Sequence, residues 1–254
     1  MNSLVSIIMP SYNTSQYISE SINSVRAQTY ENWELIIVDD LSTDNTYEVV
    51  ALHFSDKRIK YLKNEKNSGA AVSRNRALRE AKGRWIAFLD SDDLWSPEKL
   101  EKQIRFMEDN HYYFSYTNYE EIDEASRPLG REVSGPKRIT KSGMYRYCWP
   151  GCLTVMYDAD RIGLIQIADI KKNNDYAMWL KACRKADCHL LNASLAMYRR
   201  RSASISDHSY VSLIKWHYRL FREAEAKKIL PSLGLTIGNL FFGVFKKLFY
   251  VKHL

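Results

Sequence analysis

The sequence contains no run of about 18 apolar residues, so no membrane-spanning helix is predicted. Nothing at the start of the chain resembles a signal peptide, because residues 1–3 lead directly into a strand-like segment. The spacing of a zinc site is also absent from the four cysteines, which are Cys148, Cys152, Cys183 and Cys188. Together these absences predict a protein of a reducing compartment, with four free thiols packed in the fold.

Acidic residues are scarce at the end of the chain. Residues 199–254 contain 11 lysines and arginines and only three acidic residues, whereas residues 1–198 contain 26 basic and 27 acidic ones. The net charge of +7 therefore belongs to the tail. A local positive charge favours an anionic membrane surface or a polyphosphate as partner over a nucleic acid.

Strand-like and helix-like segments alternate through the first 110 residues. Apolar runs bounded by turn residues predict strands at residues 4–9, 35–38, 59–62 and 85–89. Helical spacing predicts helices near residues 17–25, 46–54, 70–81 and 97–109. This alternation predicts an α/β fold, in which a mostly parallel central sheet is flanked by helices on both faces.

The second half of the chain is less regular. Strands are predicted at residues 112–118, 152–157 and 193–197, and helices at residues 175–186 and 210–228. Residues 120–143 are polar and rich in turn formers, and we expect an irregular excursion there. The final segment is predicted to be an amphipathic helix whose apolar face carries Ile237, Leu240, Phe241, Val244, Phe245, Leu248 and Phe249.

Polar residues follow three of the predicted parallel strands. Residues 10–13 follow the first strand, Asp39 and Asp40 follow the second, and residues 90–93 follow the fourth. Ligands of such sheets bind at the carboxyl ends of the strands, so we expect the three clusters to line one crevice.

The cluster at residues 90–93, Asp-Ser-Asp-Asp, is the most informative. Three carboxylates at the end of a buried strand are costly unless a positive charge lies beside them. Carboxylate oxygens suit Mg²⁺ or Mn²⁺, and such an ion can hold a diphosphate. The alternative is an acidic turn before a helix, with Ser96 as the N-cap and Pro97 at the first helical position.

Two further segments carry candidate ligand contacts. Asp39 and Asp40 can accept hydrogen bonds from a uracil imide or a ribose hydroxyl, and the alternative is a turn with Asp44 as a helix cap. Arg74 follows small residues at the start of a predicted helix, where phosphates and nucleotides bind. Its alternative role is an ion pair with one of the strand-end aspartates.

Residues 5–13, 36–46, 67–75 and 88–93 together resemble the family 2 glycosyltransferases of the GT-A fold. The order and spacing of the motifs match over about residues 3–110, and more weakly over residues 150–205. The resemblance implies a UDP-sugar as donor, a divalent Mn²⁺ or Mg²⁺ ion, and transfer with inversion. It divides the chain into a nucleotide-sugar-binding half at residues 1–110, an acceptor and catalytic half of the same domain at 111–205, and a basic amphipathic helical tail at 206–254.

The resemblance also implies roles for the residues of the donor site. Asp39 is expected to contact the uracil ring, and Pro10 and Tyr12 are expected to line the base pocket. The Asp-x-Asp signature of the fold is met by Asp90 and Asp92, which are expected to hold the ribose and the metal ion, respectively. The donor site is further expected to include Asn13, Asp40, Arg74 and Ser91.

Asp175 is the expected catalytic base. In the family a Glu-Asp pair starts a helix and precedes an aromatic residue and Trp-Leu, and residues 174–180 match with Asn174 in place of the glutamate. An inverting transfer needs a carboxylate that takes the proton of the acceptor hydroxyl; the alternative is that Asp175 only caps the helix. Asn174 and Trp179 are expected beside the acceptor pocket. The alternative for Trp179 is a position in the hydrophobic core, without contact to the acceptor.

An arginine-rich segment follows the predicted strand at residues 193–197. The family often has a loop here that closes over the donor diphosphate, so Arg199 or Arg201 is expected to contact phosphate. His208 is a candidate metal ligand, with an ordinary surface position as the alternative. The Gln-x-x-Arg-Trp motif of processive synthases does not occur, which favours the addition of a single sugar.

Residues 169–172 resemble the corresponding segment of enzymes that build capsules, teichuronic acid or lipid-linked oligosaccharides. The expected acceptor is then a glycan carried on a polyprenyl diphosphate, for a bacterial surface polysaccharide. The basic tail at residues 206–254 fits the anionic inner face of the cell membrane, so a cytoplasmic, peripheral protein is expected. The alternative is that the tail packs on the catalytic domain or on a partner subunit.

Two other functions are compatible with a sheet of this kind. A nucleotidyltransferase needs a Gly-rich phosphate loop with Arg and Lys directly after the first strand, where this chain has residues 10–13. A non-catalytic sugar-nucleotide-binding protein has no need of Asp92 and Asp175. Both functions are therefore disfavoured.

Overall fold

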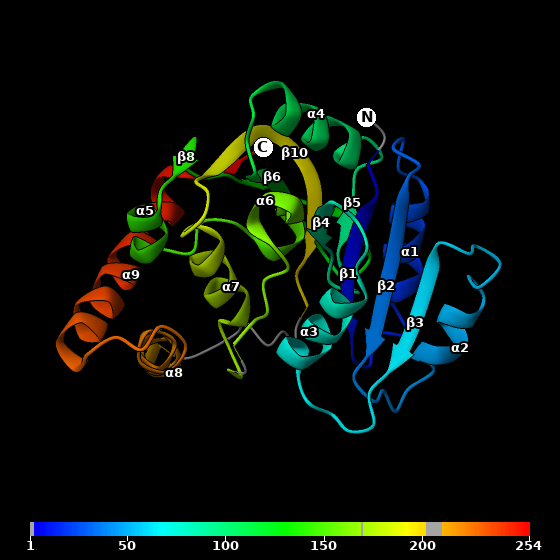
Figure 1. Ribbon diagram of the computed structural model, residues 1–254, viewed down its shortest axis with the longest axis horizontal. Helices are drawn as coiled ribbons and strands as arrows, with labels where there is room; N and C mark the ends of the chain where they lie inside the picture. The colour runs from blue at the N-terminus through cyan, green and yellow to red at the C-terminus, as the bar shows by residue number, and fades with distance from the viewer. Residues whose placement is uncertain (1–2, 169, 202–209) are drawn as a thin grey trace.

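Four parallel strands form the first half of the central sheet in the computed structural model, which describes residues 3–168, 170–201 and 210–254. In the order β4-β1-β2-β3, these are β1 (Val5–Ser11), β2 (Trp33–Asp39), β3 (Ile59–Lys63) and β4 (Trp85–Phe88). Every residue of β1 and β4 is buried, because helices cover both faces of the sheet. The connecting helices are α1 (Ile18–Arg26), α2 (Thr46–Ala51), α3 (Ala70–Glu80) and α4 (Lys99–Asp109) (Figure 1).

The second half of the sheet is mostly antiparallel. Beyond β4 it continues through β9 (Met156–Asp158), β6 (Phe114–Ile122), β7 (Pro128–Val133) and β11 (Val251–His253). The long strand β10 (Cys188–Arg199) runs parallel to β6 and also pairs with β5 (Leu94–Trp95) and β8 (Arg138–Ile139). The remaining helices are α5 (Lys141–Arg146), α6 (Ala159–Ile162), α7 (Asn174–Ala182), α8 (Tyr210–Arg219) and α9 (Ile229–Phe249).

Three expectations for the second half are corrected. Residues 120–143 are not an irregular excursion, since they contain β7, β8 and the start of α5. Only Val133 of β7 is buried, so the composition of this segment does not reveal a strand whose pairing is made by the backbone. The predicted strand at 152–157 starts only at Met156, because Cys152–Thr154 forms a 3₁₀ turn, and the predicted helix at 175–186 ends at Ala182.

The tail packs against the rest of the chain. Leu220 and Phe221, in a short π-helix after α8, belong to the buried core. Asn239 of α9 donates a hydrogen bond to the Tyr145 carbonyl at 3.1 Å. Within the described part of the chain, α9 is long and apolar enough to cross a membrane, which corrects the expectation that no such helix exists.

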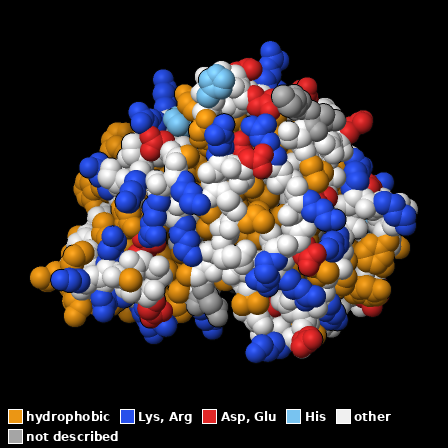
Figure 2. Space-filling model, in the orientation of Figure 1, with side chains coloured by type: hydrophobic (Ala, Val, Ile, Leu, Met, Phe, Trp, Pro, Cys, Tyr) orange, Lys and Arg blue, Asp and Glu red, His pale blue; other side chains and the backbone are white. Residues whose placement is uncertain are grey.

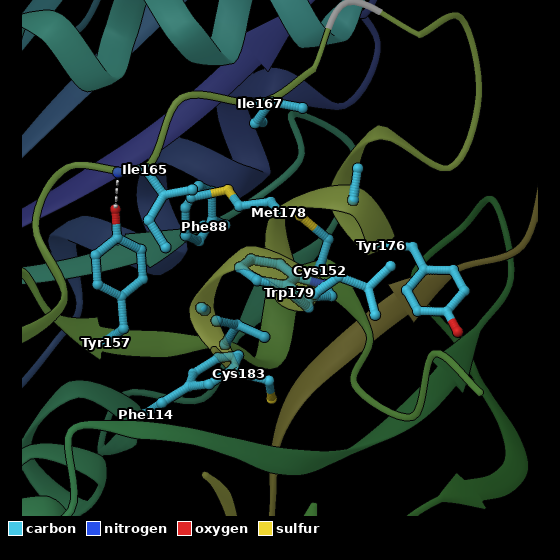
Figure 3. Packing of buried hydrophobic residues seen from close by; sticks show 14 of the residues in the cluster. Phe88, Phe114, Cys152, Tyr157, Ile165, Ile167, Tyr176, Met178, Trp179 and Cys183 are labelled. Atoms are coloured by element: carbon cyan, nitrogen blue, oxygen red, sulfur yellow. Dashed lines mark hydrogen bonds between the residues drawn. The ribbon is translucent and has the colours of Figure 1, made fainter. Parts of the chain in front are cut away.

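The core beneath the parallel strands is aromatic (Figure 3). Trp179 of α7 is fully buried, with its ring centre 5.2 Å from that of Phe88 in an edge-to-face contact and 5.9 Å from that of Phe114. Met178 and Cys152 belong to the same cluster, and all four cysteines are free thiols, as predicted. This packing fixes α7 against the sheet and thereby fixes the position of the first turn of α7.

Candidate active site

The carboxyl ends of β1, β2 and β4 lie side by side. Ser11 and Asp39 are paired across β1 and β2, and the Asp40 N–H donates to the Ser11 carbonyl at 2.8 Å. Leu89, directly after β4, donates its N–H to the Ile8 carbonyl of β1 at 3.1 Å. The arrowheads of β2 and β3 mark this end of the sheet in Figure 1. The three polar clusters therefore meet at one edge, as the sequence predicted.

Asp39 is a fixed acceptor at the end of β2. Its buried carboxylate accepts hydrogen bonds from the Ser42 N–H at 3.1 Å and from the Tyr61 hydroxyl at 2.7 Å. Burial and the bond to Asp39 raise the pKa of Tyr61, so its hydroxyl remains a donor at neutral pH. Of the other two residues expected here, Pro10 is buried and Tyr12 is 48% exposed.

Asp40 and Asn13 shape the loops around the site. The Asp40 carboxylate accepts hydrogen bonds from the Gly69 N–H at 2.6 Å and from Asn64 Nδ2 at 2.7 Å. Asn13, which has a positive φ of 51°, accepts a hydrogen bond from the Thr43 N–H at 2.8 Å. Both side chains use their oxygens within the protein, which favours a supporting role over a direct donor contact.

Arg74 of α3 connects the donor end of the site to α7. Its side chain is 8% exposed and donates to Asp90 Oδ1 at 2.5 Å and to Asn174 Oδ1 at 2.7 Å. This is the ion pair with a strand-end aspartate that the sequence left open as the alternative to a phosphate contact. Because Asn174 and Asp175 start α7, Arg74 also holds the expected base near Asp90.

The turn at residues 90–93 places its carboxylates in different environments. Asp92 forms an ion pair with Arg201 at 3.0 Å, and both side chains are partly exposed. Asp93 is buried and accepts a hydrogen bond from the Arg199 N–H at 2.8 Å. Burial, and then the neighbouring carboxylates, raise the pKa of both Asp92 and Asp93. A cation beside Asp92 reduces this cost, and here Arg201 supplies it.

Arg199 is enclosed by the protein. Its side chain is fully buried and donates to the Asp92 carbonyl at 2.7 Å, to Ser126 Oγ at 2.8 Å and to Glu20 Oε2 at 2.8 Å. Ser91, expected at the donor site, is also buried in this turn. Arg199 therefore supports the turn, and Arg201 remains the candidate phosphate contact of the two arginines.

Asp175 lies in the first turn of α7 and is partly open to solvent. Burial raises the pKa of Asp175, and the Arg74 cation opposes the rise. A carboxylate with a raised pKa is a better proton acceptor, which suits the role expected of it. Trp179, one turn further along α7, lies in the core and not at the pocket surface, as its alternative assignment foresaw.

Sequence reasoning missed Glu20 and His217. Glu20 of α1 holds the buried Arg199, and His217 of α8 packs edge-to-face on Tyr176, with ring centres 6.2 Å apart. No local pattern links residues so distant in the chain, because periodicity reports only which face of an element is apolar.

No group of three or more His, Cys, Asp or Glu side chains within residues 3–168, 170–201 and 210–254 is arranged to hold a metal ion. The oxygens of Asp90 and Asp92 nevertheless fit Mg²⁺ or Mn²⁺, because such ions often use one or two carboxylates and complete their shell with phosphates and water. The Arg201 cation beside Asp92 supports a preference for positive charge here. His208 lies outside the described residues.

Solved structures share this fold. Staphylococcus aureus TarS 1–349 in complex with UDP-GlcNAc matches with a TM-score of 0.73, covering 93% of this chain and 71% of that chain at 23% identity. The mannosyltransferase PcManGT of Pyrobaculum calidifontis, in complex with GDP-Man and Mn²⁺, matches with a TM-score of 0.68 over 96% of this chain and 71% of that chain at 16% identity. The fold is therefore that of the GT-A glycosyltransferases.

Sequence similarity narrows this class to one family. Residues 6–155 match the profile described as Glycosyl transferase family 2. The Escherichia coli UDP-Glc:alpha-D-GlcNAc-diphosphoundecaprenol beta-1,3-glucosyltransferase WfgD is 46% identical over 212 residues, which cover 83% of this chain and 82% of the relative. The chain belongs to glycosyl transferase family 2 and is a glycosyltransferase, as its motifs predicted.

Proposed function

We propose that this glycosyltransferase moves one sugar from a UDP-sugar to a hydroxyl of a lipid-linked glycan, with inversion, in the synthesis of a bacterial surface polysaccharide. The observation that carries the proposal is that Arg74 links Asp90, at the end of β4, to the start of α7, where Asp175 lies. A carboxylate pair suited to a cation and a proton acceptor thus belong to one site. A non-catalytic binding protein needs no such combination.

Asp175 accepts the proton of the acceptor hydroxyl while that oxygen forms a bond to the anomeric carbon of the donor sugar. The bond between the anomeric carbon and the diphosphate oxygen breaks, and its electron pair leaves with UDP. The oxygen enters opposite the leaving group, so the configuration inverts. Arg201 lies on the donor side of the site and meets the negative charge that develops on the diphosphate.

Asp90 and Asp92 are the residues that would hold a divalent ion. When bound, the ion supplies electrostatic stabilisation to the leaving diphosphate. Arg199 and Asp93 keep the turn in place from beneath, through the bond between the Arg199 N–H and Asp93 Oδ1. Arg201, which is partly exposed, is free to exchange Asp92 for a phosphate oxygen.

The donor nucleotide binds at the ends of β1 and β2 in this proposal. Asp39 accepts from the uracil, with Pro10 and Tyr12 beside the base. The name of the relative WfgD specifies both of its substrates, with UDP-Glc as the donor and a GlcNAc-diphosphoundecaprenol as the acceptor. UDP-glucose and a GlcNAc-diphosphate lipid are therefore the first substrates to test.

The outer face of α9 is proposed to lie in the surface of an anionic membrane. The side of α9 that faces the protein buries Ser232, Thr236 and Asn239 and packs Leu235, Phe242 and Phe245 against the core, so the remaining apolar residues of the helix point outward. Figure 2 shows hydrophobic side chains along the edge where Figure 1 draws α9, with Lys and Arg beside them. The most exposed apolar residues of the helix are Leu230, Ile237, Phe241, Val244, Leu248 and Phe249.

Two observations favour a helix that lies on the membrane over one that crosses it or pairs with a second copy. The end of α9 is tied to the domain, because β11 pairs with β7 and Lys246 Nζ donates to the Trp149 carbonyl at 2.7 Å. Residues 210–254 carry eight lysines and arginines and two acidic residues, so two such faces repel each other. Anionic lipid offers both the apolar layer and the complementary charge.

UDP release from UDP-glucose with Mn²⁺ and a GlcNAc-diphosphate lipid tests the proposed reaction. Asp175→Asn is expected to lower kcat by about 10²- to 10⁴-fold, because an amide cannot accept the proton. Asp109→Asn, at the exposed end of α4, is the matched control and should keep the wild-type rate. Full activity of Asp175→Asn would overturn the base assignment, and no release from any UDP-sugar would overturn the reaction.

A further inference from the structure

A cluster of two cations and an aromatic ring joins α8 to the segment before α7. Trp216 is partly exposed, with the Arg219 guanidinium carbon 4.9 Å and Lys172 Nζ 5.9 Å from its ring centre. Lys172 belongs to the segment at residues 169–172 that the sequence singled out and that the donor site does not use. Figure 1 draws α8 end-on beside the lower end of α7.

The residue after Trp216 packs against the first turn of α7. His217 is buried, its Nδ1 lies 2.9 Å from the Leu213 carbonyl, and its ring packs edge-to-face on Tyr176 at 6.2 Å. Burial lowers the pKa of His217, and the hydrogen bond to the Leu213 carbonyl and the charge of Asp175 oppose the change. Helix α8 therefore packs on the first turn of α7, which also carries Asp175, the residue that the acceptor hydroxyl has to reach.

We propose that Lys172, Trp216 and Arg219 bind the diphosphate-linked end of the acceptor, at a second site separate from that of the donor diphosphate. The ligand is a sugar 1-diphosphate on a long aliphatic chain. This inference rests on the proposed function, which supplies an acceptor of that class. The indole face packs against the sugar ring, and the ammonium and guanidinium groups pair with phosphate oxygens.

The spacing along the chain fits one sugar ring. Lys172 stands three positions before Asp175, which limits the distance between their Cα atoms to about 10 Å. A hexose whose hydroxyl meets Asp175 carries its anomeric phosphate on another side of the ring, within reach of Lys172. The donor diphosphate belongs to a different element, the turn after β4 where Arg201 pairs with Asp92.

The charges around the cluster can accept an anion. Arg219 pairs with Glu223 at 2.7 Å, and both side chains are more than 40% exposed. Surface ion pairs of this kind contribute about 1 kcal/mol or less, so a phosphate can replace Glu223 at small cost.

This site is tested by measuring KM for two acceptors that contain the same sugar. In one acceptor the sugar is linked to an alkyl diphosphate, and in the other it is linked to a neutral alkyl chain. Lys172→Ala/Arg219→Ala is expected to raise KM for the diphosphate acceptor by about 100-fold or more, because two charge-assisted hydrogen bonds are lost and each is worth about tenfold or more. KM for the neutral acceptor and for UDP-glucose should not change. Lys215→Ala, an exposed lysine next to Trp216, is the matched control and should leave every constant unchanged.

Further variants separate recognition from folding. Trp216→Ala is expected to raise KM for both acceptors, because the indole contacts the sugar, and Trp216→Phe should restore much of the loss. Thermal unfolding and UDP binding report whether each variant folds. If the double variant is unstable, the single variants Lys172→Gln and Arg219→Gln replace it, together with the salt dependence of KM for the wild-type protein, which should be steep only for the diphosphate acceptor.

The outcomes distinguish this site from the reaction on which it rests. Equal changes in KM for the two acceptors, or no change for the diphosphate acceptor, would overturn the second site and leave the proposed function intact. If the wild-type protein transfers sugar to neither acceptor, the proposed function fails and the second site fails with it.

Discussion

At the scale of single residues, Arg199 and Arg201 differ in what surrounds them. Arg199 is fully buried among protein acceptors, whereas Arg201 is 25% exposed and pairs with Asp92. The sequence offered both as phosphate contacts, because two arginines so close together look alike until their partners are known. Only the fold brings Glu20 and Ser126 to Arg199.

The two arginines are therefore expected to respond differently to substitution. Arg199→Gln should destabilise the fold by about 3 kcal/mol or more, because buried acceptors and Glu20 lose their partner. Arg201→Gln should keep the thermal midpoint and weaken UDP binding. Thermal unfolding and calorimetry with UDP and Mn²⁺ measure both effects; equal losses of stability in the two variants would contradict the assignment.

The pH profile of the reaction should depend on Arg74. Burial raises the pKa of Asp175 and Arg74 holds it down, so Arg74→Gln raises that pKa further. The base works only when deprotonated, and activity is lost as pH falls through its pKa. The acidic limb of kcat is thus expected to move to higher pH in Arg74→Gln, measured at saturating donor. Arg79→Gln, on the exposed side of α3, is the control, and an identical limb in Arg74→Gln and wild type contradicts the prediction.

At the scale of elements, Gly83 is the point where the chain between α3 and β4 passes closest to β1. A Cβ at this position would lie 2.6 Å from the Ser6 nitrogen and 2.7 Å from the Leu4 oxygen, both backbone atoms that cannot easily move. Gly83→Ala is expected to cost about 1–3 kcal/mol of unfolding free energy.

Chemical denaturation measures the unfolding free energy of Gly83→Ala, and a second glycine provides the comparison. Gly234 lies in α9, and a Cβ there would have no atom within 4 Å. Gly234→Ala is expected to be neutral or to stabilise the protein by about 0.5–1 kcal/mol, because alanine is the better helix former. A destabilisation of Gly234→Ala as large as that of Gly83→Ala would show that the contact with β1 is not the cause.

The elements that the sequence predicted well are those with a strong apolar signal. β1, β2 and β4 are buried on both faces and α1 and α4 on one stripe, so their composition identifies them. The sequence did not predict β7 and β8, because few of their side chains are buried and their apolar pattern is weak. The prediction of the site is limited in a similar way. The ends of the strands predict where the carboxylates lie, but the sequence does not predict which distant residues pair with them.

Helix α9 shows what amphipathicity leaves open. The sequence correctly placed Ile237, Phe241 and Leu248 on an apolar face, but a two-sided pattern does not say which side the protein covers. In the fold the covered side carries Ser232 and Asn239 together with Phe245, which the sequence had assigned to the apolar face, and the exposed side carries the other large apolar residues.

At the scale of the whole molecule, the exposed face of α9 predicts lipid binding. Ile237→Glu/Phe241→Glu should abolish co-flotation with vesicles that contain anionic phospholipid, because two charges then enter the apolar layer. Leu52→Glu, at an exposed leucine directly after α2, is the control and should have no effect. Wild-type protein that stays with the soluble fraction, or that forms a dimer lost in the double variant, would count against membrane docking.

The pairing of β11 with β7 makes residues 251–254 part of the central sheet. If residues 251–254 were removed, the backbone groups of β7 would be left open to strands from other molecules. The Leu254 N–H closes this ladder on the Gly130 carbonyl at 2.8 Å. A fusion placed directly after Leu254 would therefore crowd the short ladder of β11 with β7 and the hydrogen bond from Leu254 to Gly130.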